Sequence, residues 1–154
     1  MARPVCSRTP AAPRRSGRAF ADIRVMTEHD YISRLREGRA QDRDASLEVI
    51  ALADEAVRAF PQSARLWVMR GDLIQMGPEL CPHPLEESLR SYQRAVEADP
   101  QFAEAWEEIG HYHDAVLDDE EGARQYFARA RSLKENGEQG AARNSHPAGQ
   151  PSDL

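Results

Sequence analysis

Apolar residues recur in the central part of the chain at steps of three and four positions, which is the spacing of amphipathic helices. Six stretches of this kind lie between residues 27 and 134, and runs of β-branched residues are few. Breaks that contain proline or glycine separate several of them, most clearly at Pro61, Gly77-Pro78 and Asp99-Pro100. The pattern predicts an all-α fold whose helices cover about residues 27–40, 46–59, 63–76, 84–98, 102–116 and 118–134.

Residues suited to helix ends stand at several of these boundaries. Asp44 and Ser63 are candidate N-caps for the second and third helices, and Pro84 suits the first turn of the fourth. Four consecutive acidic residues, 118–121, stand where the sixth helix should begin, and the positive end of the helix dipole stabilises negative charge there.

Matching residues recur at two fixed intervals. The pairs Pro61 and Pro100, Trp67 and Trp106, Gly71 and Gly110, and Ala56 and Ala95 are each 39 residues apart. The pairs Ser88 and Ala123, Tyr92 and Phe127, and Ala95 and Ala130 are 35 apart. An insertion of about five residues in the loop at 77–83 reconciles the two intervals, because it lengthens only those that straddle it. The underlying period is then about 34 residues.

The spacing within each unit is that of a known repeat. Trp67-x-x-Arg70-Gly71-x-x-Ile74, Trp106-x-x-Ile109-Gly110-x-x-His113 and Ala123-x-x-x-Phe127 resemble the tetratricopeptide signature, and the resemblance covers residues 27 to 134. It implies a short right-handed α-solenoid of about three helix-turn-helix hairpins with antiparallel helices, at about 27–61, 63–100 and 102–134. The first repeat is degenerate, because Arg36 stands where glycine is expected and no tryptophan precedes it. A plain helical bundle with chance recurrences is the alternative.

Small residues in the repeat have a physical purpose. Gly71 and Gly110 should let the two helices of a hairpin approach closely. Small side chains on the facing helices keep those helices thin, while aromatic residues fill the space between hairpins. These small residues are Ser88, Ala95, Ala123 and Ala130.

In tetratricopeptide proteins the first helix of each hairpin lines a concave groove that commonly binds peptides. The resemblance places Arg65, Val68, Asp72, Gln75, Glu104, Glu107, His111 and Asp114 at groove positions. Members that clamp an acidic C-terminal carboxylate use Lys, Arg and Asn there, and this chain does not match them. Three carboxylates in the third hairpin instead predict a partner of basic or amphipathic character. A solvated acidic helix face is the alternative.

Charge is distributed unevenly along the chain, whose formal net charge is -6. Residues 1–25 hold six Arg and one Asp, residues 26–134 hold 13 basic and 22 acidic side chains, and residues 135–154 carry a net -2. The first segment is predicted to be a disordered arm and the last a disordered tail around the repeat domain at 26–134. The acidic body argues against nucleic acid binding through the folded domain. The basic arm is a candidate competitor for an acidic groove, although disorder without docking is the simpler interpretation.

The end of the array suggests a second interaction surface. Solenoids generally need a polar terminal cap, and a disordered tail cannot supply one. The last hairpin should then expose apolar surface that supports weak homo-oligomer formation. The residues concerned are Tyr126, Phe127, Ala130 and Leu133.

Motifs for catalysis, metals and cofactors are missing from the sequence. His111 and His113 are two positions apart on a helix, so they diverge by about 200° and cannot face one metal ion. Phosphate-binding loops, nucleophile elbows and paired cysteine motifs do not occur, so neither an enzyme nor a cofactor is predicted. Cys6 and Cys81 do not form a disulfide framework, and no apolar run is long enough for a membrane span or a secretory signal, which predicts a cytoplasmic protein with no membrane contact.

The sequence therefore predicts a non-catalytic protein–protein interaction module, an adaptor or scaffold that uses the groove. A structural module that self-associates through its last hairpin is the second hypothesis. A small enzyme or metal-binding protein is a distant third.

Overall fold

The structure is a computed structural model that describes residues 25–41 and 45–144, and this part of the chain is entirely helical apart from its connecting loops. Residues 1–24 and 145–154, on which the predicted arm and much of the predicted tail fall, lie outside the described residues. The helices are α1 (Glu28–Gln41), α2 (Leu47–Ala59), α3 (Ala64–Gln75), α4 (Glu86–Ala98), α5 (Ala103–Ala115) and α6 (Glu120–Asn144). The predicted all-α fold is confirmed.

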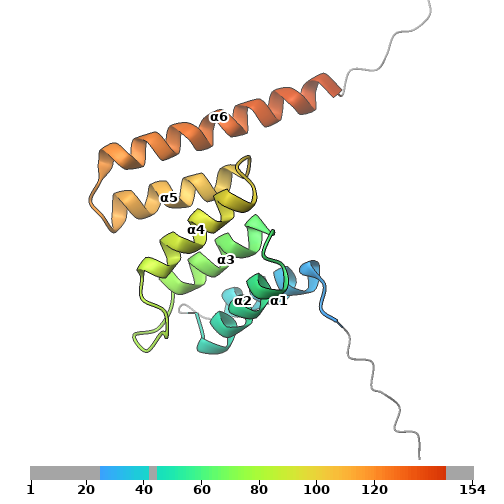
Figure 1. Ribbon diagram of the computed structural model, residues 1–154, viewed down its shortest axis with the longest axis vertical. Coiled ribbons are helices and arrows are strands. Elements are labelled where there is room, and N and C mark those ends of the chain that lie inside the picture. The colour runs from blue at the N-terminus through green and yellow to red at the C-terminus, as the bar shows by residue number, and fades with distance from the viewer. Residues whose placement is uncertain (1–24, 42–44, 145–154) are drawn as a thin grey trace, which may run out of the picture.

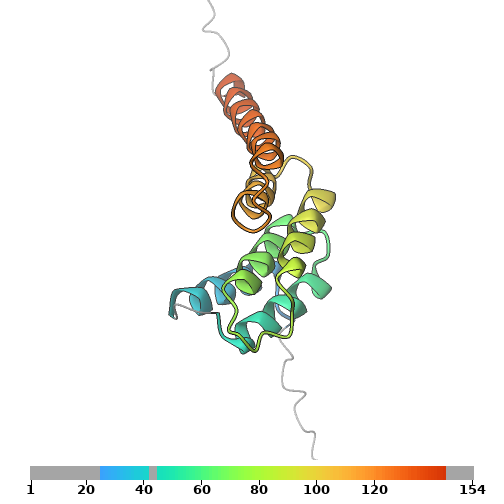
Figure 2. The same cartoon turned by 90° about the vertical axis from the view of Figure 1, so that its left-hand side faces the viewer.

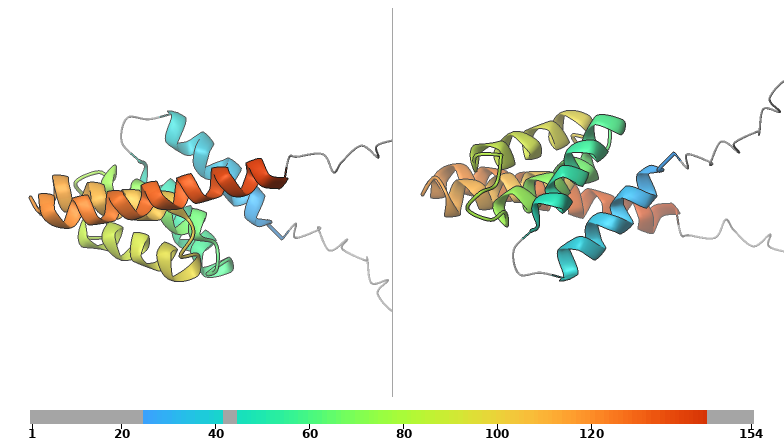
Figure 3. Two further views of the ribbon diagram at one scale, coloured as in Figure 1. Left: turned by 90° about the horizontal axis from the view of Figure 1, so that it is seen from above. Right: turned by 90° about the horizontal axis from the view of Figure 1, so that it is seen from below.

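The helices form three antiparallel hairpins that stack one on the next (Figures 1 and 2). The hairpins pair α1 with α2, α3 with α4, and α5 with α6; α2 contacts α3 and α4 contacts α5 between them. Helix α3 also contacts both α1 and α5, so the three first helices form an inner layer. Seen along the stack, α6 is in front from above and α1 is in front from below, so the first and last helices lie at opposite ends (Figure 3).

Equivalent residues of the second and third hairpins make equivalent contacts, as the sequence repeat predicts. The indole Nε1 of Trp67 donates to the carbonyl oxygen of Pro61 at 2.8 Å, and that of Trp106 donates to Pro100 at 3.0 Å. A Cβ added to Gly71 would lie 2.4 Å from the Tyr92 ring, and one added to Gly110 would lie 2.7 Å from the ring of Phe127. The two glycines therefore permit close helix approach, as predicted.

The first hairpin uses a different glycine. A Cβ on Gly38 would lie 2.5 Å from Cγ2 of Val49, so α1 and α2 approach closely at a glycine two positions beyond Arg36. The Tyr31 ring packs edge-on against Phe60, and its hydroxyl donates to Glu55 at 2.6 Å. Helices α1 and α2 thus pack against each other, with a close approach two positions later in α1 than the sequence predicts.

Helix caps follow the sequence in part. Ser63 caps α3 by accepting from the Leu66 N–H at 3.3 Å, as predicted. Helix α2 begins one residue after Ser46, whose hydroxyl accepts from the Val49 N–H, while Asp44 lies outside the described residues. The acidic run before α6 contains Asp118 with φ of 53° and Asp119, whose carboxylate accepts from the Gly122 N–H at 3.0 Å.

The inserted segment at 77–83 is an irregular loop between α3 and α4, as predicted. The residue just before this loop and the last residue of the loop both contact the first hairpin. The Ala45 N–H donates to the carbonyl oxygen of Met76 at 2.7 Å, and His83 Nε2 lies 2.7 Å from Asp54. The loop tip carries Leu80, which is 83% exposed.

Helix α6 is longer than expected. The sequence predicts an irregular tail after Lys134, whereas α6 continues to Asn144 and extends past α5 (Figure 1). Extending an existing helix costs little once it is nucleated, and residues 135–144 contain Glu, Gln, Ala and Arg, which favour helix. The glycines and asparagines of this stretch misled the prediction. Among the described helices, none combines the length and apolar character that crossing a membrane requires.

Candidate functional site

A shallow groove runs across the inner layer formed by α1, α3 and α5. It contains two adjoining hollows of about 120 and 150 Å³ that share Arg39 and Asp72. The first is lined by Arg36, Arg39, Arg65, Val68, Met69, Asp72 and Glu104, and the second by Arg39, Asp72, Gln75, Met76, Tyr92 and Glu108. Five of the eight predicted groove residues thus meet at one surface: Arg65, Val68, Asp72, Gln75 and Glu104.

Asp72 lies at the centre of the groove and is already engaged. Arg39 Nη1 is 2.9 Å from its Oδ2, and the Tyr92 hydroxyl donates to its Oδ1 at 3.1 Å. Gln75 Nε2 in turn donates to the Tyr92 hydroxyl at 2.9 Å. Burial raises the pKa of Asp72, and the arginine and tyrosine contacts oppose this effect only in part. Asp72 therefore organises the groove more than it offers a free charge to a ligand.

The groove carries charge of both signs. Arg36 and Arg39 of α1 stand beside Arg65 of α3 at one side, and carboxylates of α5 stand at the other. The sequence interpretation described an acidic groove because the degenerate first repeat gave no register for α1. The acidic character predicted from the third hairpin thus lies opposite a basic side, to which Arg36 and Arg39 add to the predicted Arg65.

Glu108 is the groove residue that the sequence interpretation missed. Burial raises the pKa of its carboxyl group, the nearby charge of Asp72 adds to this, and Glu107 and Glu104 contribute further, while His111 opposes them. Among the described residues no cationic side chain forms an ion pair with Glu108. Its position one helical turn after Glu104 places it on the same helix face, and this spacing could have identified it as a groove residue.

Two predicted groove residues face the last helix instead. Glu107 Oε2 is 2.7 Å from Lys134 Nζ on α6, and the His111 ring packs edge-on against Phe127 with centroids 5.0 Å apart. Both line a separate hollow of about 320 Å³ between α5 and α6. Asp114 is exposed near the end of α5 and lines none of these hollows. The third hairpin therefore presents its predicted charges on more than one surface.

The predicted self-association surface is packed against α5. Ala130 and Leu133 are buried, and Phe127 occupies the space that Gly110 leaves open. Tyr126 stacks on Trp106 with ring centroids 6.2 Å apart and also contacts His113. The exposed positions of this part of α6 are mostly polar or small: Arg124, Gln125, Ala128, Arg131 and Ser132. Helix α5 thus covers much of the apolar face of α6, with Ala130 and Leu133 buried and Tyr126 and Phe127 half-buried, so less apolar surface is exposed than the sequence predicts.

The histidines occupy structural contacts. His113 Nδ1 donates to Asp119 Oδ2 at 2.9 Å while its ring packs on Tyr126. The Gly122 N–H and then His113 hold the pKa of Asp119 below its ordinary value. Within the described ranges, no three His, Cys, Asp or Glu side chains are grouped so that they could hold a metal ion.

Comparison with known proteins supports the fold. No protein-family model and no curated protein matches the chain. Among solved structures, the crystal structure of MamA, a tetratricopeptide-type protein, superposes with a TM-score of 0.51 at 17% sequence identity. The match covers 73% of this chain and 71% of that one. The chain therefore has a tetratricopeptide-like helical repeat fold, and at this identity the likeness concerns the fold alone.

Proposed function

We propose that this protein is a non-catalytic interaction module, an adaptor or scaffold, which holds a peptide or helix of a partner protein in the groove of α1, α3 and α5. The repeat fold supports this proposal because stacked hairpins present one continuous inner surface. The observation that carries it is Glu108, a half-buried carboxylate with other carboxylates nearby and no cationic partner among the described residues.

An uncompensated carboxylate in a groove favours a cationic ligand. Ionised Glu108 is disfavoured by burial and by like charge, and the attraction of a Lys or Arg side chain placed beside it offsets these penalties. The partner segment is therefore basic where it meets α5. Charge attraction of this kind also speeds association and weakens as salt rises.

The opposite side of the groove indicates a second charge requirement for the ligand. Arg36 and Arg65 are exposed there and form no ion pair with other described residues, whereas Arg39 is engaged by Asp72. A segment with basic residues toward α5 and an acidic residue toward α1 matches both sides. The proposed partner segment thus carries basic residues in one part and an acidic residue in another, and this asymmetry fixes the direction in which it binds.

Two labelled synthetic peptides of equal composition test the groove, one with lysines followed by glutamates and one with the two kinds alternating. Fluorescence anisotropy should show tighter binding of the peptide in which the lysines precede the glutamates. The affinity for that peptide should fall about tenfold in Glu104→Gln/Glu108→Gln, a loss of about 1.4 kcal/mol in binding free energy. Glu120→Gln, an exposed change at the start of α6, is the matched control. Equal binding by wild type and double variant would refute the proposal.

The pH dependence gives an independent check. A cationic peptide favours ionised Glu108, so its affinity should fall as pH is lowered through the raised pKa of that group. The same titration with Glu108→Gln should be flatter. A wild-type profile no steeper than that of the variant would assign the pH dependence to other groups.

A further inference from the structure

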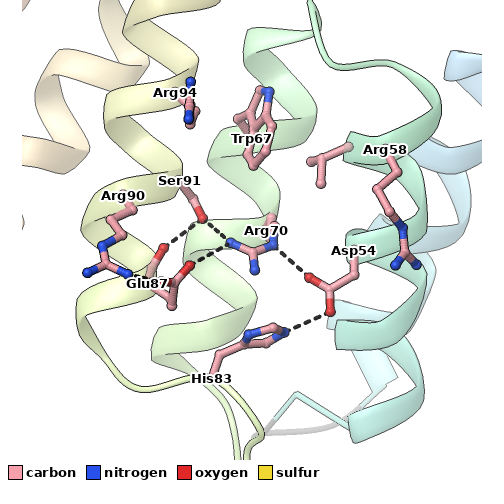
Figure 4. Close-up of a pocket in the computed structure, with 10 residues that line it drawn as sticks. Asp54, Arg58, Trp67, Arg70, His83, Glu87, Arg90, Ser91 and Arg94 are labelled. Carbon is pink, nitrogen blue, oxygen red and sulfur yellow. Dashed lines mark hydrogen bonds and ion pairs between the residues drawn. The ribbon is translucent and has the colours of Figure 1, made fainter.

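A larger cleft lies on the other side of α3, between α2 and α4. Its volume is about 450 Å³, and Trp67 and Arg70 of α3 form its floor (Figure 4). On the helix these two residues point away from the face that carries Arg65 and Asp72. The remaining lining residues are Asp54, Val57, Arg58, His83, Glu87, Arg90, Ser91 and Arg94. The cleft is therefore separate from the groove formed by α1, α3 and α5.

The next repeat shows why this cleft is open. Trp106 is covered by Tyr126, which stacks on it, and by the guanidinium of Arg129, whose Cζ is 5.9 Å from the ring centroid. At the repeat interval of 35 residues, the position of Tyr126 is taken by Ser91 in α4. A small hydroxyl side chain thus replaces the aromatic ring, and the space above Trp67 stays unfilled.

A charged side chain replaces an apolar one at the base of the cleft. Arg70 occupies the position that Ile109 holds in the next repeat, and it is only 8% exposed. Its Nε donates to Asp54 Oδ1 at 2.7 Å and its Nη1 to Ser91 Oγ at 2.6 Å, while Glu87 Oε2 lies 3.8 Å away. Burying a guanidinium is costly unless its donors form hydrogen bonds or ion pairs, and the contacts with Asp54, Ser91 and Glu87 offset that cost here.

One of the three guanidinium nitrogens, Nη2, is left over. Nη2 of Arg70 makes no hydrogen bond with the described residues, although every buried side-chain nitrogen or oxygen among them has a partner. Nη2 is therefore not fully buried, and Figure 4 shows it between Glu87 and Asp54 in the cleft that Arg70 lines. The cleft thus offers an anion a donor that the fold holds in place.

The charge of the cleft is positive in a protein whose net charge is -6. Four arginines and two carboxylates line it. Both carboxylates are engaged, because Asp54 contacts Arg70 and His83 while Glu87 contacts Arg70 and Arg90.

The two remaining arginines are available to a ligand. Arg58 forms no ion pair with another described residue. Arg94 contacts Glu97 at 2.9 Å, but both side chains are exposed, and such surface pairs contribute little. They stand on either side of Trp67 in Figure 4.

The cleft continues past Trp67. An adjoining hollow of about 370 Å³ shares Trp67 and Arg94 and is lined further by Pro61, Gln62, Glu97 and Ala98. The two hollows together follow α4 from the inserted loop toward its C-terminal end. Because their lining runs along α4 from Glu87 to Ala98, they suit an extended peptide of several residues better than a single small anion.

We propose that this cleft binds an acidic peptide segment of a partner protein. One carboxylate of the segment accepts from Arg70 Nη2, further carboxylates pair with Arg58 and Arg94, and an apolar side chain packs on the exposed face of Trp67. This site goes beyond the groove of the inner layer, and together the two would let the module contact differently charged segments on opposite faces.

Labelled peptides containing Asp-Phe-Glu or the neutral Asn-Phe-Gln between identical glycine and serine flanks test the site. Wild-type protein should bind the acidic peptide at least tenfold more tightly. Arg58→Glu/Arg94→Glu should remove that preference, and both changes lie at exposed positions, so the fold should persist in circular dichroism. Arg124→Glu/Arg131→Glu on α6 is the matched control and should bind as wild type does. Equal binding of the two peptides, or acidic-peptide binding weaker than about 1 mM, would overturn the proposal.

A second variant tests the cleft by filling it. Arg70→Ile/Ser91→Tyr gives the second repeat the residues of the third, so the introduced tyrosine ring should stack on Trp67 and exclude the peptide. In a Trp106→Phe background, the fluorescence of Trp67 should respond to the acidic peptide before this change and not after it. Retained binding in the filled, folded variant would contradict the assigned location. Glu108→Gln should leave acidic-peptide binding unchanged, which separates failure of this proposal from failure of the groove.

Discussion

The surroundings of Trp67 and Trp106 differ although the two tryptophans hold the same place in successive repeats. Each donates to the carbonyl of the proline six residues before it. Around Trp106 the neighbouring side chains are Tyr126 and Arg129, which cover the ring, whereas Ser91 leaves space beside Trp67. One backbone unit can therefore carry a closed aromatic stack or an open polar cleft, depending on two or three side chains.

The largest expected effect comes from moving the buried charge into the closed repeat. Ile109 is 3% exposed, and Ile109→Arg would bury a guanidinium that has no prepared carboxylate, at a cost of about 4 kcal/mol or more. Urea denaturation followed by circular dichroism measures this loss. The reverse change, Arg70→Ile, should cost only about 2 kcal/mol, because Asp54 keeps His83 as a partner. Similar losses of unfolding free energy for the two changes would contradict the idea that only the second repeat has partners for a buried guanidinium.

The close approaches at the two glycines should differ in tolerance. A Cβ on Gly71 meets the Tyr92 ring, which is buried and whose hydroxyl is held by Asp72 and Gln75. A Cβ on Gly110 meets Phe127, whose partly exposed ring has no such hydrogen bonds. Gly71→Ala should therefore destabilise by about 3 kcal/mol and Gly110→Ala by about 1 kcal/mol. Thermal denaturation of both variants provides the measurement, and the opposite order would contradict the assigned rigidity of Tyr92.

The Asp54 cluster should make the second repeat sensitive to acid. Burial would raise the pKa of Asp54, but hydrogen bonds from Arg70 and His83 outweigh it and hold the pKa below its ordinary value of 3.8. The stabilisation is therefore present above that value and is lost as pH falls through the lowered pKa of the folded state. Asp54→Asn should cost about 1 kcal/mol near neutral pH and progressively less in acid. Gln93→Asn, at an exposed position of α4, is a control that should show no such trend.

The smallest effect is expected at Glu108, whose counterpart in α3 is Met69. The raised pKa of Glu108 means that its ionisation destabilises the folded state, and that this penalty is present above the raised pKa and disappears as pH falls below 4.5. Glu108→Gln should therefore increase stability at neutral pH by about 0.5 kcal/mol. Glu107→Gln, which loses the contact with Lys134, should not increase it. Calorimetry at two pH values distinguishes the two.

Much of the fold could be predicted because it depends on local residues at a regular interval. Trp67, Trp106, Gly71 and Gly110 identify the hairpins, and the unequal intervals locate the inserted loop. The first hairpin was harder, because its close approach uses Gly38, outside the expected register. The length of α6 was missed because helix extension depends on what precedes a segment as well as on its composition.

The candidate sites were less predictable because they depend on contacts between repeats. The repeat register places Glu107 and Glu108 on one helix, but only the packing of α6 shows that Lys134 engages the first and leaves the second free of an ion pair with the described residues. The arginines of α1 reach the groove through the stacking of the first hairpin on α3. The cleft at Trp67 requires knowing that Ser91 and Arg70 face the same space. Sequence periodicity identifies such positions but not their partners.

The inserted loop also has a consequence for cooperativity. In a solenoid each unit interacts mainly with its neighbours, and opening can begin at either end. Here the contacts of Met76 with Ala45 and of His83 with Asp54 tie the first two hairpins together, through a segment that the third hairpin lacks. Residues 45–98 are therefore expected to exchange their amide hydrogens as one unit, while α5 and α6 open separately. An extension that interrupts the sequence repeat would thus fuse two units of the array into a single folding unit.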